Sequence, residues 1–263
     1  MVWPEVGSSR ARTLPVVGRV VGVFPHPDDE AWAAGGTLAA FADAGAHVQV
    51  VFATDGEAGA DWTGALRSGA GLAAVRRAEA VDASARLGLH KPTFLGLGDG
   101  RLDARSDLPA RLQAALTPLA PDILLGFGLD GGYPHRDHLA LARALASCWE
   151  NWSGTPQPTL WQTAFAPGVF APLLRLLRRV PGGASILDPS VADASLGTAL
   201  HGTRAIALDA AAVARKRAAL AAHHSQLRAG DPANLLGKGV VPALLHVEHW
   251  CVREPTPAET RSA

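Results

Sequence analysis

Residues 19–24 read RVVGVF, and residues 25–30, which follow directly, read PHPDDE. The first segment is a continuous apolar run rich in β-branched residues, which is typical of a strand buried on both faces of a sheet. The second segment brings one histidine and three acidic residues to the end of that strand. Because buried charge is costly unless it is paired or binds a ligand, this cluster is the first candidate for a functional site.

Strands and helices alternate from this segment to about residue 149. We expect strands at residues 47–53, 92–97 and 122–127, and helices at residues 30–44, 72–87, 108–119 and 139–149. This alternation predicts an α/β fold with a Rossmann-like, mostly parallel sheet flanked by helices. Such sheets bind ligands beyond the carboxyl ends of their strands, which is where the acidic cluster lies.

The pattern loosens from about residue 150. Residues 151–158 are rich in turn formers, and residues 180–202 are rich in Gly, Ala and Ser, which predicts loops over the site. Residues 209–227 favour a helix, and residues 243–252 favour a last strand. We expect a single domain over residues 1–263, with its core at about 19–228, a C-terminal elaboration of loops and helices, and a disordered tail at 255–263.

Composition argues against nucleic-acid binding, cysteine-based structural sites and membrane insertion. Lys and Arg together number 24, as do Asp and Glu, so no global field favours nucleic acid. Cys148 and Cys251 lie far apart, which argues against a disulfide framework or a zinc knuckle. Apolar residues precede the first strand, but Arg19 interrupts them, and no stretch approaches the ~20 residues of a membrane span. We therefore expect a cytoplasmic protein without a membrane span.

His26 and Asp29 are three residues apart, with Pro27 between them. Proline suits the first turn of a helix, and a helix that begins here brings the imidazole and the carboxylate together as two zinc ligands. Asp28 then points elsewhere and is free to accept a proton. Helix capping is the simpler explanation of the acids, but it accounts for only one of them, and Glu30 suits it best.

A third ligand is expected from residues 131–138, which read GGYPHRDH. His135 and His138 are spaced i, i+3, so they share one face of a helix. Three protein ligands leave a position for water, as in catalytic zinc sites, and the metal lowers the pKa of that water to about 7. The sequence thus predicts one catalytic Zn²⁺ per chain. His47 and His90 are expected to be ordinary surface or packing residues.

These two motifs in this order resemble the LmbE/PIG-L family of zinc-dependent N-acetylglucosaminyl deacetylases. That family usually has AHPDDE as its first motif and HxxH as its second. Residues 72–88 resemble its RxxE helix, residues 95–100 (LGLGDG) its Asp-Gly turn, and residues 216–226 (KRAALAAHHSQ) its late helix. The resemblance spans about residues 19–226. The departure is Pro25, which stands where the family usually has Ala and removes one backbone donor.

The resemblance implies roles for individual residues. Zinc is bound by His26, Asp29 and His138, and Asp28 is the general base. His135 stabilises the oxyanion or protonates the leaving amine. The remaining assignments each have an alternative. Tyr133 donates to the oxyanion or simply packs. Arg76 contacts substrate or organises the acids, and the alternative is a surface salt bridge with Glu79. Apart from the resemblance, Trp62 lies in the loop at residues 55–71, where it stacks on a sugar ring or anchors its own loop.

The implied substrate is a small molecule or glycoconjugate that contains N-acetylglucosamine, and the implied assembly includes possible homo-oligomers. Four alternatives remain at this point. Two of them are other hydrolases: an enzyme that cleaves another amide, for example in a thiol conjugate, and a phosphoesterase that uses Mg²⁺. The third is a dinucleotide-binding protein, because Gly126, Gly128 and Gly131 have GxGxxG spacing. The fourth is a protein that binds sugar without catalysis.

Overall fold

The computed structural model describes residues 14–180, 182–191, 203–236 and 239–255. Nearly all of the tail predicted to be disordered, and part of the loop predicted at residues 180–202, fall outside these ranges. Within them the strands are β1 Arg19–Phe24, β2 His47–Phe52, β3 Thr93–Phe94, β4 Ile123–Gly126, β5 Thr159–Ala164, β6 Arg204–Ala207 and β7 Val247–Arg253. The α-helices are α1 Asp29–Asp43, α2 Ala70–Leu87, α3 Leu108–Leu116, α4 Arg136–Glu150, α5 Ala171–Leu177, α6 Ala210–Ala222 and α7 Val240–Ala243.

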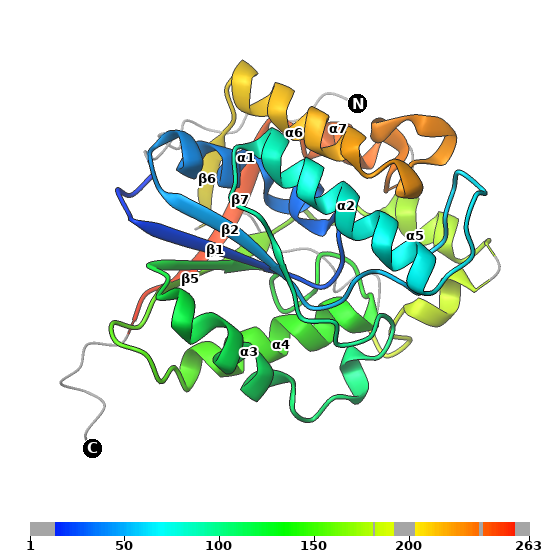
Figure 1. The fold of residues 1–263 in the computed structure, drawn as a ribbon. Helices are drawn as coiled ribbons and strands as arrows, with labels where there is room; N and C mark the ends of the chain where they lie inside the picture. Colours follow the sequence, from blue (N-terminus) through cyan, green and yellow to red (C-terminus); the bar gives the residue numbers. More distant parts are fainter. Residues whose placement is uncertain (1–13, 181, 192–202, 237–238, 256–263) are drawn as a thin grey trace.

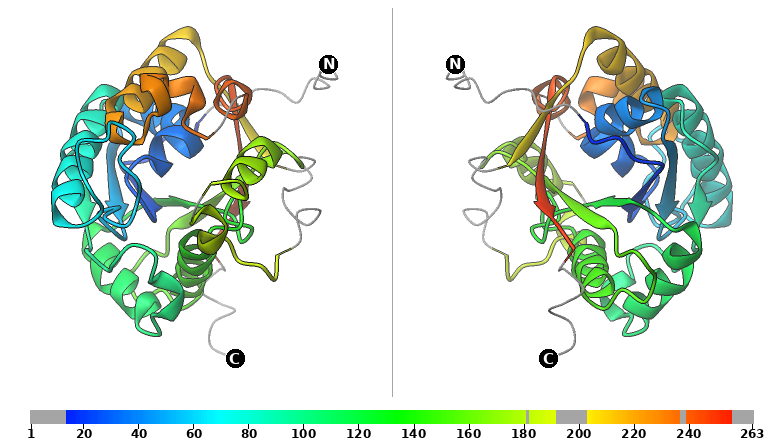
Figure 2. Two further views of the ribbon diagram at one scale, coloured as in Figure 1. Left: turned by 90° about the vertical axis from the view of Figure 1, so that its right-hand side faces the viewer. Right: turned by 90° about the vertical axis from the view of Figure 1, so that its left-hand side faces the viewer.

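The described strands form one sheet in the order β3-β2-β1-β4-β5-β7-β6. The pairs from β3 through β5 are parallel, whereas β7 is antiparallel to both of its neighbours. Helices α1, α2 and α6 cover one face of the sheet, and α3 and α4 cover the other (Figures 1 and 2). The predicted α/β class with a mostly parallel sheet flanked by helices is therefore confirmed.

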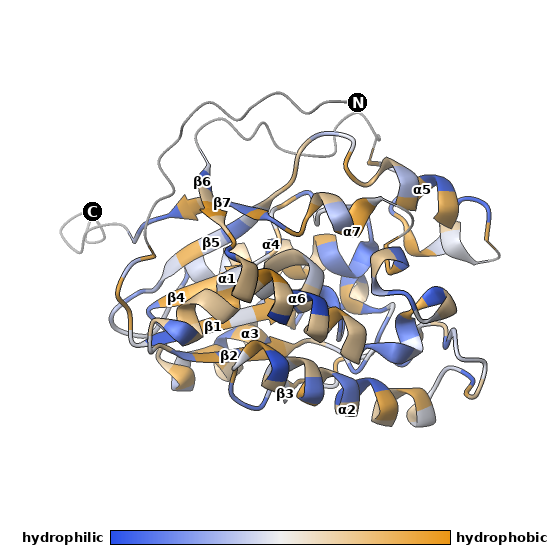
Figure 3. Ribbon diagram, turned by 90° about the horizontal axis from the view of Figure 1, so that it is seen from above, coloured by the Kyte–Doolittle hydropathy of each residue, from blue (hydrophilic) through white to orange (hydrophobic). Residues whose placement is uncertain are grey.

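Alternate residues of the central strand enter two cores. Val20 and Phe24 pack into the cluster beneath α1, whereas Val21 and Val23 pack into the cluster beneath α3 and α4. This division follows from the two-residue period of a strand, and it explains why residues 19–24 are apolar without alternation. Figure 3 shows the hydrophobic residues gathered in β1 and β4 at the centre of the sheet.

Several predicted boundaries were wrong for local physical reasons. The third strand keeps only Thr93–Phe94 because Gly96, at φ 59°, turns the chain. The helix predicted over residues 209–227 ends at Ala222, where the chain turns so that the His223 ring reaches Glu30. The last strand starts at Val247 because residues 240–243 form a short helix. Strands β5 and β6 and helix α5 were not predicted.

Among the described residues, no helix combines the length and apolar character that a bilayer crossing requires.

Candidate active site

The acidic cluster lies where the strand order of the sheet reverses. β1 pairs with β2 on one side and with β4 on the other, so the connections that leave β1 and β4 diverge at their carboxyl ends. Open α/β sheets bind ligands at this switch point. The connection after β1 carries His26, Asp28 and Asp29, and the one after β4 carries Tyr133 and His135. The motifs lie at the predicted edge of the sheet.

Asp28 has an unusual backbone at the start of α1. The helix begins at Asp29, so the prediction that Pro27 occupies its first turn was wrong. Asp28 is the N-cap with φ 120°, a conformation that costs a non-glycine residue of order 1–3 kcal/mol. The Asp28 N–H donates to Glu30 Oε2 over 3.0 Å. Glu30 thus holds the strained residue, which is more than the first-turn helix role predicted for it.

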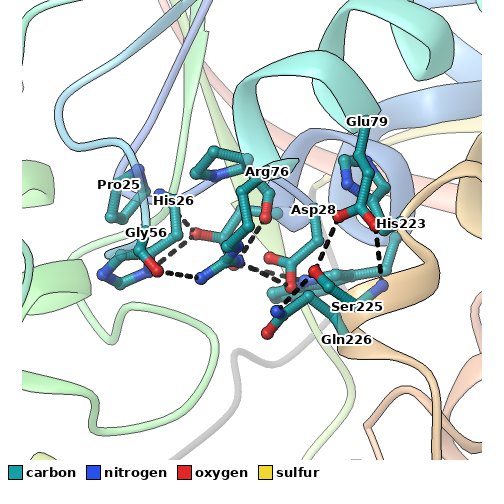
Figure 4. Close-up of polar contacts among 12 residues, drawn as sticks. Pro25, His26, Asp28, Gly56, Arg76, Glu79, His223, Ser225 and Gln226 are labelled. Carbon is teal, nitrogen blue, oxygen red and sulfur yellow. Dashed lines mark hydrogen bonds and ion pairs between the residues drawn. The ribbon is translucent and has the colours of Figure 1, made fainter. Parts of the chain in front are cut away.

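Arg76 of α2 is buried and holds the same loop (Figure 4). Its Nη2 donates to the Pro27 carbonyl and lies 3.2 Å from Asp28 Oδ2, while its Nη1 donates to the Gly56 carbonyl. Gly56 has φ +72°, and a Cβ there would lie 2.3 Å from Nη1, so only glycine permits this approach. The alternative of a surface salt bridge with Glu79 was wrong.

Glu79 instead binds the chain that follows α6. Its carboxylate accepts hydrogen bonds from the Ser225 N–H and hydroxyl, each over 2.7 Å (Figure 4). Farther back, His223 Nε2 lies 2.9 Å from Glu30 Oε1, and both side chains are fully buried. Helix α2 and the end of α6 therefore support the Asp28 loop from behind. His223 was not predicted as a site residue.

The predicted metal ligands His26, Asp29 and His138 converge. His26 Nδ1 lies 3.2 Å from Asp29 Oδ2, and His138 Nε2 lies 3.4 Å from Asp29 Oδ1. His138 Nδ1 bonds the Gly131 carbonyl over 2.9 Å, so in the neutral ring Nε2 is the bare acceptor. That Nε2 is buried and has no hydrogen-bond partner among the described residues.

The charges at this point favour a cation. Burial raises the pKa of Asp29, but His138 and His26 outweigh it and the pKa falls to about 2. Burial lowers the pKa of His138. At neutral pH an ionised carboxylate therefore faces a neutral imidazole lone pair, two acceptors with no proton between them. A divalent metal bound by both satisfies them, and zinc suits imidazole and carboxylate ligands.

His135 lies in the same group but is oriented differently. Ring nitrogens of His26, His135 and His138 lie within 4.8 Å of one another. His135 Nδ1, however, accepts the Asp137 backbone N–H over 3.1 Å and caps α4. The neutral ring therefore carries its proton on Nε2, and burial keeps its pKa well below the ordinary value. This tautomer donates a hydrogen bond and does not ligate a metal.

Two acidic residues at the site were not predicted as site residues. His26 Nε2 lies 3.0 Å from Asp99 Oδ1 and 3.2 Å from Asp137 Oδ2. Asp137 also accepts the N–H groups of Gly100 and Leu102, so it ties the turn after β3 to α4. The signals were the Asp-Gly turn and the acid between the two histidines of residues 135–138. Together these carboxylates orient His26.

The candidate catalytic groups have shifted pKa values. Burial raises the pKa of Asp28 to about 7, against the opposing charge of Arg76. A general base with this pKa is suited to neutral pH. Burial also raises the pKa of Tyr133 well above its ordinary value, so its hydroxyl stays protonated and can donate. The Tyr133 ring packs on the His138 ring, with centroids 4.7 Å apart.

A cavity of about 710 Å³ opens over these residues. Its inner end is lined by His26, Asp28, Asp29, Arg76, Tyr133 and His135. Trp62 lines its outer part and is 45% exposed, and the Arg228 guanidinium stacks 3.8 Å from its ring centroid. All the predicted site residues except His138, which is buried beneath it, thus line one cavity, and the cavity is within the usual size range of small-molecule sites.

Two other sequence expectations concern the loops. The Gly126, Gly128 and Gly131 spacing does not open a helix, because α4 begins only at Arg136; a dinucleotide site needs that helix N-terminus. Pro25 contributes its carbonyl, which accepts the Thr54 N–H and hydroxyl. These two hydrogen bonds hold the loop after β1 at Pro25, although proline has no N–H to donate. His47 and His90 are exposed and stack on each other, as expected for surface residues.

Sequence comparisons agree with the motifs. The sequence model of the family described as PIG-L, GlcNAc-PI de-N-acetylase, matches residues 21–149. A 1D-myo-inositol 2-acetamido-2-deoxy-alpha-D-glucopyranoside deacetylase from Corynebacterium diphtheriae is 31% identical over 248 residues, covering 81% of this chain and 78% of that protein. A protein of the same name from Rhodococcus jostii is 29% identical and covers 88% of this chain and 90% of its own length.

Solved structures share the fold. N,N'-diacetylchitobiose deacetylase from Pyrococcus horikoshii has a TM-score of 0.60 at 22% identity, over 91% of this chain and 87% of that chain. The 4-carboxy-2-hydroxymuconate hydratase from Pseudomonas putida has a TM-score of 0.61 at 19% identity, over 91% of this chain and 98% of that chain. Because a deacetylase and a hydratase share this fold, the activity has to be argued from the site.

Proposed function

Because this chain belongs to the PIG-L (LmbE) family, we propose that it is a zinc-dependent deacetylase that removes the N-acetyl group from a small molecule or glycoconjugate containing N-acetylglucosamine. The observation that carries the proposal is the pair of facing acceptors, Asp29 Oδ1 and His138 Nε2, next to Asp28, which lines the same cavity and is held by Arg76. A cation site next to a carboxylate that can accept a proton is the arrangement that metal-assisted hydrolysis needs.

His26, Asp29 and His138 would hold one zinc ion. When bound, zinc lowers the pKa of a water molecule to about 7 and polarises the amide carbonyl. Asp99 and Asp137 orient the His26 ring, and the Gly131 carbonyl fixes the tautomer of His138. Carboxylate and carbonyl partners of this kind commonly orient ligating histidines.

Asp28 accepts the proton of the attacking water as the new C–O bond forms. Its raised pKa, about 7, allows it to hold that proton and then to deliver it to the nitrogen as the C–N bond breaks. Acetate and a free amine are the products. Arg76 keeps Asp28 near the cavity through its contacts with both the carboxylate and the loop carbonyls.

His135 and Tyr133 stabilise the negative charge that develops on the carbonyl oxygen. Burial keeps the His135 ring neutral, because it lowers the pKa of that ring, and the Nε2–H is available to donate. Tyr133 donates from its hydroxyl. Donors that are fixed before the reaction are worth about 10²–10³ in kcat each. Trp62 provides an aromatic face for the sugar at the outer part of the cavity.

The test is acetate release from a panel of N-acetylglucosamine compounds by four preparations: wild type, chelated protein, zinc-restored protein and Asp28→Asn. We expect activity in the first and third, and little in the others. Stoichiometric zinc without release from any compound would identify a sugar-binding protein or an enzyme for another amide. Release that survives complete removal of metal would refute the zinc mechanism.

A further inference from the structure

The cavity over the site has two chemically different ends. The inner end holds the charged residues described above, and the outer end is bounded by α5, the 183–186 turn and the 235–236 segment. Most of the outer lining is apolar: Leu176, Leu177, Val180, Ile186, Leu235 and Leu236. We name these six residues the apolar wall. Figure 1 shows α5 and the loop that precedes α2 on the same side, beyond the carboxyl ends of β1 and β2.

The sequence of α5 explains why part of this wall faces the cavity. Leu173, Leu176 and Leu177 are spaced i, i+3 and i+4, which places them on one stripe of α5, and Val180 lies in the turn after the helix ends at Leu177. Leu173 reaches the hydrophobic core. Leu176 and Val180 are only half-buried, and among the described residues they belong to no hydrophobic core cluster. Their apolar surface is therefore available to whatever occupies the cavity.

Some of the polar atoms at the outer end already have partners. Gln226 Nε2 donates to the Ala60 carbonyl and to Ser225 Oγ, and Ser185 Oγ donates to the Gly182 carbonyl. The Arg228 guanidinium lies on the Trp62 ring. The lining offers a polyol the Gln226 carbonyl oxygen and the Arg228 N–H groups but otherwise mostly apolar side chains, so a polyol would replace only part of the hydrogen bonds that it loses to water.

From this lining we propose that the substrate carries an apolar substituent next to its N-acetylglucosamine unit, and that the apolar wall binds it in preference to a polyol such as inositol. The inference rests on the proposed function, because the cleaved amide must occupy the inner end. The hydrocarbon can be attached through the glycosidic oxygen or can replace the methyl of the acyl group. Either attachment is compatible with the structure, because the catalytic residues and the wall line the same cavity.

The experiment compares four α-glycosides with the zinc-loaded protein: methyl, n-hexyl and 1D-myo-inositol N-acetylglucosaminides, and a methyl glycoside with N-hexanoyl in place of N-acetyl. Release of the free amine gives kcat/KM for each. A buried methylene is worth about four-fold in affinity, so we expect at least about ten-fold preference for one hexyl compound over the methyl N-acetyl compound. The preferred hexyl compound identifies the attachment.

Variants separate the wall from other causes. Leu176→Asn should lower the hexyl-to-methyl ratio about five-fold with little change for the methyl compound, while Leu176→Met should retain the ratio. Val81→Asn is the matched control, because Val81 is a half-exposed aliphatic residue of α2 outside the cavity. Equal kcat/KM for hexyl and methyl compounds, or preference for the inositol compound, would overturn the inference.

A binding measurement distinguishes this inference from the proposed function. Calorimetry with Asp28→Asn, which should bind without turnover, should show one of the two compounds with a six-carbon chain binding at least about ten-fold more tightly than the methyl N-acetyl compound. If the wild type releases amine from none of the four compounds, the proposed function fails. The calorimetry would then still decide whether the cavity selects apolar substituents.

Discussion

The guanidinium of Arg76 lies 3.2 Å from the carboxylate of Asp28, although 48 positions separate the two residues in the chain. The same guanidinium donates to the carbonyls of Pro27 and Gly56, so one side chain joins the loops after β1 and β2. Its charge also lowers the pKa of Asp28 against the effect of burial. Arg76 is therefore positioned to control both the place and the protonation of the proposed base.

Replacing Arg76 with methionine should raise the pKa of Asp28, because the remaining burial favours the protonated carboxyl. The acid limb of kcat/KM should move to higher pH, and activity at pH 7 should fall by up to about ten-fold when that limb moves by one pH unit. The measurement is the pH profile of kcat/KM for wild type and variant. Partial recovery of the variant at higher pH is the expected signature.

Arg77→Met is the control for that experiment. Arg77 is the next residue of the same helix and pairs with Asp55 over 3.1 Å, but its side chain is 49% exposed. Exposed pairs contribute about 0–1 kcal/mol, so this variant should keep both the stability and the pH profile of the wild type. An Arg76→Met profile that is lowered uniformly, without moving along the pH axis, would contradict the electrostatic role of Arg76.

The pH dependence of the wild type follows from Asp28 itself. A general base must be ionised, so activity should fall as pH drops below its pKa, which is about 7 in the metal-free protein. A nearby zinc ion favours the ionised carboxylate and so lowers the pKa of Asp28 from this value. The acid limb should therefore be centred at or below about 7. Asp28→Asn should lower kcat by about 10²–10⁴ and remove this limb. A limb that persists in Asp28→Asn with the same midpoint would assign it to another group.

Zinc content should distinguish the two histidines of residues 135–138. His138 has a bare Nε2 facing Asp29, whereas His135 presents a protonated Nε2. His138→Gln should therefore lose most of its zinc, while His135→Gln should retain about one ion per chain and lose about 10²–10³ in kcat. Metal analysis after dialysis, with kinetics on the same samples, measures both. If His135→Gln lost its zinc and His138→Gln kept it, His135 would be the ligand and His138 would not.

The sequence predicted the sheet and the ligand candidates because both depend on local patterns. The apolar run of β1 is followed by PHPDDE within the same short segment, and the fold rule for parallel sheets places that segment at the switch point. His135 and His138 follow β4 in the same way. The resemblance already assigns zinc to His138 and not to His135. The structure adds the backbone group that each ring contacts, and these contacts support the assignment.

Contacts between distant segments were mostly not predicted; the one exception was the alternative in which Arg76 organises the acids, which its contact with Asp28 bears out. Arg76 and Glu79 are one turn apart on α2, which suggested a pair on the helix surface, but each is buried against a different partner, Asp28 and Ser225 respectively. Strand β5 and helix α5 are short and apolar, and a short apolar run does not distinguish a strand from a buried helix. The apolar wall was missed together with α5.

The buried pair of Glu30 and His223 gives the last prediction. Glu30 accepts the N–H of the strained Asp28 and also bonds His223, and neither side chain is exposed. Glu30→Leu removes both contacts and leaves His223 unpaired in the interior, so it should cost about 3–5 kcal/mol. Glu30→Gln keeps an acceptor for Asp28 and should cost less. Thermal unfolding of the two variants measures which of them is less stable.

Stability alone does not separate a positioning role from a structural one, so the control is another buried pair. Lys216 of α6 lies 2.5 Å from Glu248 of β7, and both are buried away from the cavity. Lys216→Met should lower stability comparably but leave kcat close to that of the wild type. Glu30→Leu should retain zinc yet lose kcat at temperatures where it is still folded, because Asp28 is no longer held at its positive φ. If Glu30→Leu and Lys216→Met changed kcat equally, Glu30 would have only a structural role.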